Sequence, residues 1–147
     1  MRLSRFTDYS LRVLIYLGQN DQDRVTINQI SESYDISKNH LMKVVSNLTR
    51  LKFVNAQRGP GGGIRLNHNP KDISLREVIR NTEKHLNPAN RPDPESVHGI
   101  EVDTRLEGYL HKALQAYLDT LGGFTLEDVL ASQAESVDLL VLEEQVA

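Results

Sequence analysis

Cysteine is absent from the 147-residue chain. Disulfide bonds and thiolate metal sites are therefore excluded. No stretch approaches the roughly 18 uninterrupted apolar residues that a membrane-spanning helix needs. The N-terminal residues lack the apolar core and small-residue cleavage site of a signal peptide. With 39% apolar and 25% charged residues, the composition is ordinary for a globular protein, and we expect it in the cytoplasm.

Catalytic motifs are absent as well. The sequence has no cysteine nucleophile, no G-x-S-x-G elbow and no H-E-x-x-H pair. Five histidines are scattered along it, and only His98, Glu101 and Asp103, with His85 across the same loop, suggest a metal site. Isolated groupings of this kind in a polar loop are usually exposed to solvent. We therefore expect neither an enzyme nor a metal site.

Charge is divided unevenly along the chain. Residues 1–80 hold 13 Lys/Arg against 7 Asp/Glu, a balance of +6, whereas residues 81–147 hold 4 against 13, a balance of −9. A basic N-terminal part beside an acidic C-terminal part suggests a module that binds a polyanion.

The basic part predicts three helices. The first is expected at about Thr7–Leu17 with Thr7 as its cap, and the second begins at Thr26, where Gln29 completes a capping box. Ser37 caps the third helix. Its apolar residues recur at helical spacing and form one stripe: Leu41, Val44, Val45, Leu48 and Leu51.

A basic hairpin is predicted to follow these helices. Phe53–Ala56 and Ile64–Leu66 are short apolar runs around Arg58-Gly-Pro-Gly-Gly-Gly63, whose glycines can adopt a positive φ at a tight tip. The glycine run lacks the lysine and hydroxyl residue of a nucleotide-binding loop, and no helix opens directly after it. A helix–turn–helix with a hairpin behind it predicts a winged helix–turn–helix DNA-binding domain over residues 1–82.

The acidic part has a different organisation. After a short helix opened by a capping box at Ser74–Glu77, residues 83–103 form a proline-containing loop. Residues 104–132 hold a long helix, Thr104–Leu121, stopped by two glycines, and a short helix that starts at Thr125. Residues 133–147 are an acidic tail. The long helix carries a wide apolar stripe that favours self-association: Leu106, Leu110, Ala113, Leu114, Tyr117, Leu118 and Leu121.

The predicted DNA contacts follow from this layout. Recognition helices present their N-terminal residues to base edges in the major groove, where Asn pairs with adenine and Lys or Arg contacts guanine or phosphate. Arginines beside a glycine-tipped hairpin suit the minor groove or the phosphates. The predicted DNA-binding residues are Thr26, Ser37, Lys38, Asn39, His40, Lys43, Arg58, Gly62, Gly63 and Arg65. Asn47 and Arg50 lie further along the same helix.

Over roughly residues 1–132 the sequence resembles the NsrR/IscR family of bacterial winged-helix regulators, and among them the nitric-oxide-responsive repressors. The resemblance rests on residues 6–16, 36–43, 58–66, 105–114 and 124–129. It implies a homodimer joined through Thr104–Leu121, a palindromic operator, and a DNA contact by Arg12. Sensing members of this family carry three cysteines in the loop before the dimer helix, which hold an iron–sulfur cluster. This sequence has none, so we expect no such cofactor.

The sequence thus predicts a mainly α-helical, dimeric winged-helix regulator that works without a cluster and represses by blocking promoter access. Two alternatives remain open. One is a winged-helix adaptor that binds proteins without DNA. The other is a regulator that senses a small molecule or a metal through residues 86–101.

Overall fold

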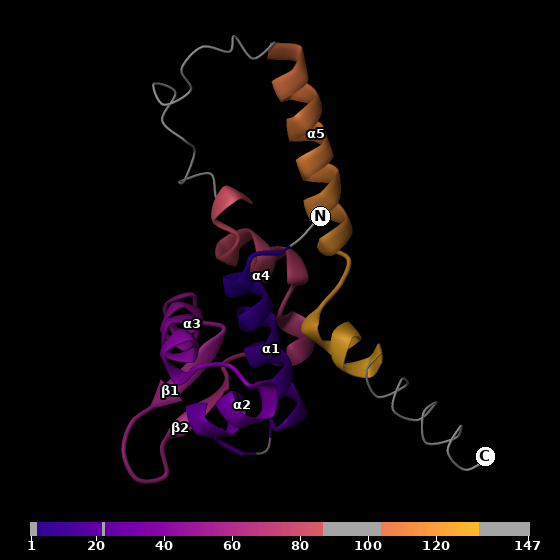
Figure 1. The fold of residues 1–147 in the computed structure, drawn as a ribbon. Helices are drawn as coiled ribbons and strands as arrows, with labels where there is room; N and C mark the ends of the chain where they lie inside the picture. Colours follow the sequence, from indigo (N-terminus) through magenta and orange to yellow (C-terminus); the bar gives the residue numbers. More distant parts are fainter. Residues whose placement is uncertain (1–2, 22, 87–103, 133–147) are drawn as a thin grey trace, which may run out of the picture.

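A computed structural model describes residues 3–21, 23–86 and 104–132 of the chain. In chain order the elements are α1 (Arg5–Gln19), α2 (Ile27–Tyr34), α3 (Lys38–Arg50), β1 (Val54–Gln57), β2 (Gly63–Leu66), the 3-10 helix η1 (Pro70–Asp72), α4 (Leu75–Thr82), the 3-10 helix η2 (Lys84–Leu86) and α5 (Thr104–Leu121). Residues 126–132 are also helical. The expected mainly α-helical fold with a small antiparallel hairpin is confirmed (Figure 1).

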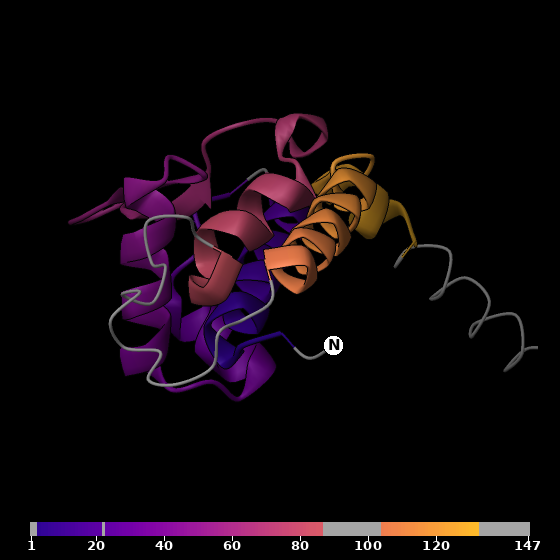
Figure 2. The same cartoon turned by 90° about the horizontal axis from the view of Figure 1, so that it is seen from above.

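The core lies around α1, which runs through the middle of the body between α3 and the residues after α5 (Figures 1 and 2). Helical spacing places the apolar side chains of each helix on the face that it turns inward. Buried side chains from α1, α3, α4 and the hairpin meet there, among them Val13, Leu14, Leu17, Leu41, Val44, Leu48, Val54, Ile64 and Val78. One continuous core therefore fixes α3 and the hairpin relative to each other.

The base of the hairpin is anchored to the segment before α2. Val25 and Ile64 exchange two backbone hydrogen bonds of 2.9 and 2.7 Å, so Val25 adds an isolated bridge beside β2. Gly63 has a φ of 147°, and a Cβ at this position would lie 3.0 Å from the Val25 carbonyl oxygen. Glycine is needed here because the two backbones approach so closely.

Two predicted helix caps differ from the structure. Ser4, not Thr7, caps α1: its Oγ accepts the Thr7 N–H at 3.2 Å, and Thr7 is a fully buried residue of the first turn. Ser74 precedes α4 but makes no side-chain capping bond. The N–H of Leu75, the first residue of the helix, donates to the Phe124 carbonyl at 3.0 Å, so a distant part of the chain satisfies one N–H group of this helix end.

The residues after α5 return to the winged-helix body. Leu126 is 1% exposed within the main core, and its N–H donates to the Ile73 carbonyl at 2.9 Å. The predicted capping box at Thr125 is formed, and hydrogen bonds from its backbone and hydroxyl lower the pKa of the Asp128 carboxyl. Residues 126–132 therefore pack with the N-terminal domain, although the sequence grouped them with the dimerisation helix.

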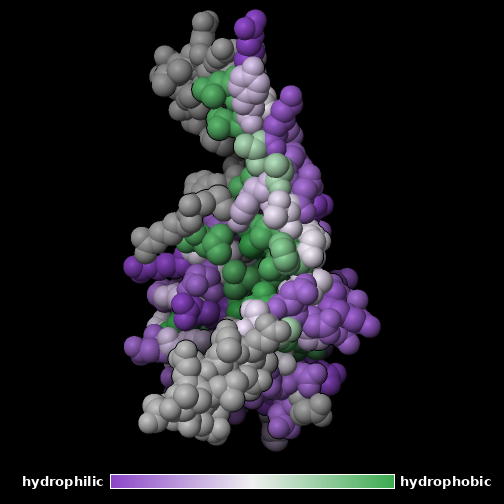
Figure 3. Space-filling model, turned by 90° about the vertical axis from the view of Figure 1, so that its right-hand side faces the viewer, coloured by the Kyte–Doolittle hydropathy of each residue, from purple (hydrophilic) through white to green (hydrophobic). Residues whose placement is uncertain are grey.

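Helix α5 has the predicted bounds but divides into two parts. Near its C-terminal end Leu118 is 6% exposed, whereas Leu106 and Leu110 are 50% and 60% exposed. Figure 3 shows hydrophobic side chains along the upper part of the molecule, where α5 stands. The prediction that Leu118 faces a partner is therefore wrong, because packing within the chain already covers it. Most of the predicted 83–103 loop, including His98, Glu101 and Asp103, lies outside the described residues, as does the 133–147 tail.

Candidate nucleic-acid interface

Helix α3 buries one stripe and exposes the opposite one. Ser37 caps it by accepting the His40 N–H at 3.3 Å. The predicted contact residues at its start are all exposed: Ser37, Lys38, Asn39, His40 and Lys43. The His40 ring also lies against Tyr9 of α1, with centroids 6.1 Å apart. Two lysines and one amide are thus presented on an outward helix face.

A shallow hollow runs along this face. Its lining residues are Asn39, Met42, Lys43, Ser46, Asn47 and Arg50. Met42 is 49% exposed, and the Asn47 Oδ1 atom is buried without a hydrogen-bond partner. Sequence reasoning missed Met42 and Ser46, although both follow Asn39 at helical spacing. An exposed methionine among polar side chains offers an apolar surface of the kind that contacts a thymine methyl group.

The hairpin tip owes its shape to glycine. Gly59 and Gly61 have φ values of 92° and 72°. A Cβ on Gly62 would lie 2.4 Å from the Gln57 carbonyl oxygen, so no side chain fits there. Arg58 is exposed at the tip and Arg65 on β2, where it pairs with Asn55. The glycines give the ribbon its narrow end, and the two arginines give it charge.

Arg24 makes a hydrogen bond to the base of the hairpin. Its guanidinium Nη1 donates to the Gly63 carbonyl at 3.3 Å. No local sequence pattern marks Arg24, because this contact spans 39 positions. Arg24 therefore adds a positive charge next to the hairpin and helps to fix its base.

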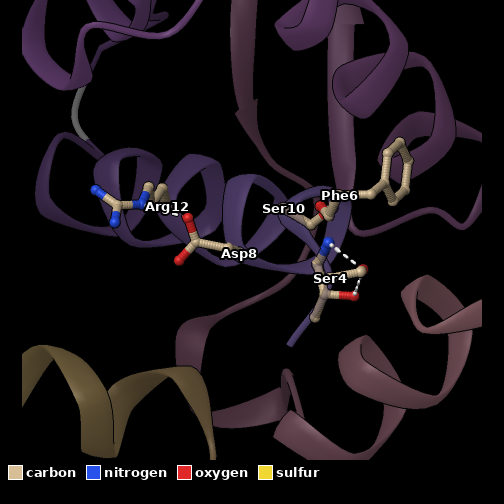
Figure 4. A network of polar contacts seen from close by, with 6 residues as sticks. Ser4, Phe6, Asp8, Ser10 and Arg12 are labelled. Carbon is tan, nitrogen blue, oxygen red and sulfur yellow. Dashed lines mark hydrogen bonds and ion pairs between the residues drawn. The ribbon is translucent and has the colours of Figure 1, made fainter. Parts of the chain in front are cut away.

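Arg12 and Thr26, also predicted to contact DNA, already have partners in the chain. The Arg12 Nε donates to Asp8 at 2.9 Å (Figure 4), and its guanidinium lies 5.5 Å from the centroid of the Tyr34 ring. Burial raises the pKa of the Tyr34 hydroxyl, and the charge of Arg12 partly opposes this. The Thr26 hydroxyl accepts the Gln29 N–H and donates to the Gln29 side-chain oxygen in the capping box of α2.

These features combine into one recognisable arrangement. Helices α2 and α3 form the helix–turn–helix, and the hairpin directly behind them carries exposed arginines. A helix of this kind fits the major groove of DNA, and a narrow basic tip fits the minor groove. The fold and its exposed side chains define a winged helix–turn–helix DNA-binding protein.

Comparisons with known proteins agree with this class. The family model Rrf2, described as an iron-dependent transcriptional regulator, matches residues 3–132. The HTH-type transcriptional regulator NsrR of Bacillus licheniformis is 47% identical over 135 residues, covering 90% of this chain and 94% of the relative. NsrR of Bacillus subtilis is 42% identical over 146 residues, covering 98% and 100%. The chain belongs to the Rrf2 family and is a DNA-binding transcriptional regulator, not an enzyme.

Solved structures show the same fold. IscR of T. potens superimposes with a TM-score of 0.73 at 22% identity, over 92% of this chain and 90% of that one. CymR, the global cysteine regulator of B. subtilis, gives a TM-score of 0.69 at 24% identity, over 90% and 98%.

An iron–sulfur cluster does not fit the donor atoms of this chain. Iron–sulfur clusters are held mainly by cysteine thiolates, and the sequence contains none. Within the described ranges, no three histidine or acidic side chains are grouped so that they could hold a metal ion. The described helices also include none that is long and apolar enough to cross a membrane.

Proposed function

We propose that the protein is a homodimeric repressor that binds a palindromic operator and works in the cytoplasm. The observation that carries this proposal is that the same chain exposes two distinct surfaces. One is the basic face formed by α3 and the hairpin, and the other is the apolar face of α5 at Leu106 and Leu110. Exposing these leucine side chains to water costs free energy, and self-association through a twofold axis would cover them.

In the proposed complex, α3 of each protomer enters a major groove and the hairpin reaches the neighbouring minor groove. In this complex Asn39 would pair with adenine, and Lys43 would contact guanine or phosphate. Arg58 and Arg65 lie on the ribbon that would follow the minor groove. Repression follows from steric exclusion, because a dimer on a promoter occupies the surface that the polymerase needs.

The basic face can be tested through salt dependence. The probe is a duplex that the protein itself selects from a random-sequence library. Arg65→Ala is expected to weaken binding and to reduce the slope of log affinity against log salt by about two, since the dimer loses one arginine from each protomer and about two counterions fewer are released. The measurement is a titration by fluorescence anisotropy at several salt concentrations.

Lys112→Ala is the matched control, because Lys112 is exposed on the polar side of α5, away from the hairpin. It should leave the slope unchanged. An Arg65→Ala protein with the parent's slope would remove Arg65 from the interface. A protein without salt-dependent affinity for any duplex would support an adaptor that binds proteins instead.

We further propose that DNA binding does not depend on an iron–sulfur cluster, since the chain supplies no thiolate. Protein purified without oxygen from iron-replete cells is expected to be colourless and free of iron. Its affinity for the selected duplex should not change after treatment with a chelator. Stoichiometric iron, together with an affinity that changes when the iron is removed, would contradict this proposal.

A further inference from the structure

Helix α5 is held to the rest of the protein near its C-terminal end. Figure 1 shows its N-terminal part standing clear of the winged-helix body, and Leu106 and Leu110 are largely exposed there. Leu118, three residues before the end of the helix, is buried. Leu114, Tyr117 and Leu121 are half-buried, so contacts along the C-terminal part of α5 set the direction in which the helix points.

Arg76 of α4 makes the polar part of this attachment. Its Nε donates to the Leu118 carbonyl at 2.8 Å, and its Nη2 donates to Asp119 at 2.6 Å. The last turn of α5 contains no basic residue of its own. Arg76 thus places a cation at the negative end of the α5 dipole, which is the favourable sign.

The guanidinium of Arg76 occupies the space that a side chain at Gly122 would fill. A Cβ on Gly122 would lie 2.7 Å from both Nε and Nη2 of Arg76. The guanidinium therefore packs directly on the backbone where α5 ends. A side chain at position 122 would push it away from both of its acceptors.

The other end of α4 is joined to α1. Glu83, at the C-cap of α4, is buried, and its Oε1 accepts the backbone N–H of Ser4 at 2.6 Å. Because α1 packs against α3 in the core, α4 lies between the attachment of α5 and the helices of the DNA-binding domain.

We propose that Arg76 is a positioning residue that fixes the direction of α5 relative to the winged-helix domain. In a dimer joined through α5, this direction sets the separation of the two α3 helices, so the inference rests on the dimer proposed above. When the direction is not fixed, only a fraction of the dimers has the separation that the DNA requires. The apparent dissociation constant rises by the inverse of that fraction.

The separation can be measured directly between protomers. Because the chain has no cysteine, Ser33→Cys on the exposed surface of α2 gives one spin label per protomer. Pulsed dipolar spectroscopy of the full-length protein should yield one narrow distance distribution. Arg76→Ala is expected to broaden or shift it and to weaken binding of the selected duplex about ten-fold, as expected if one dimer in ten keeps the required geometry. Dimer mass should be unchanged.

Gly122→Ala provides a second route to the same result, since it displaces the guanidinium and leaves Arg76 in the sequence. Gly123→Ala is its matched control, because a Cβ at Gly123 meets only the Thr120 carbonyl at 3.4 Å. Arg80→Ala, which removes an exposed charge from the same helix, controls for electrostatics. We expect Gly122→Ala to resemble Arg76→Ala, and both controls to resemble the parent.

The possible outcomes separate the two proposals. Distance distributions for Arg76→Ala and Gly122→Ala that match the parent would overturn the role of Arg76 and leave the dimer intact. A monomeric mass for the labelled parent would overturn both proposals. Thermal unfolding of each variant verifies that the fold is retained.

Discussion

Replacing Leu110 with glutamate is expected to convert the proposed dimer into a monomer and to lower affinity for the selected duplex by about 100-fold or more, because the two protomers then bind their half-sites separately. Leu110 is 60% exposed in the single chain, so the change should not disturb the fold of the protomer. In the dimer its side chain would be covered by the partner, and two glutamates brought near the twofold axis would repel each other without water to screen them.

Mass measurement by light scattering, followed by a DNA titration, checks this expectation. Gln115→Glu is the matched control, since Gln115 is exposed on the polar side of the same helix and the substitution adds the same charge. It should remain dimeric. A Leu110→Glu protein that is still dimeric would show that α5 is not the interface.

Lys43→Glu is the second substitution expected to have a large effect. Lys43 is exposed on α3 and lines the hollow on its outward face. Loss of the groove contact costs about 1–3 kcal/mol in each half-site, and the new carboxylates add repulsion from the phosphates, so affinity should fall about 100-fold or more.

Lys112→Glu makes the same change of charge on α5, away from α3 and the hairpin, and should lower affinity only slightly. Comparing the two variants at one salt concentration separates a local contact from the effect of net charge. Equal losses in both variants would mean that binding follows overall charge, and that α3 is not the recognition helix.

Much of the fold could be predicted because its signals are local. The two glycines after Leu121 mark the end of α5, and Thr26 and Ser37 cap α2 and α3 as their positions suggest. Helical spacing identified the buried stripe of α3, and the same spacing predicts that Lys38 and Lys43 are exposed to solvent. Exposure of the candidate site follows from these patterns, and its contact with DNA remains a prediction.

The missed features depend on residues far apart in sequence. The residues near Ser74 do not show that Phe124 accepts the N–H of Leu75 at the start of α4. Leu118 matches the apolar stripe of α5, and only the position of α4 shows that it is already covered. Arg76 reaches acceptors 42 and 43 positions away. Periodicity describes one element at a time, and these contacts join separate elements.

Hydroxyl-radical footprinting of the selected duplex tests most directly whether two copies of α3 and the hairpin bind one side of DNA. We predict protection on both strands in two patches related by a twofold axis, their centres separated by about one helical turn or a multiple of it. A single protected patch, or two patches without this symmetry and spacing, would contradict the proposed complex.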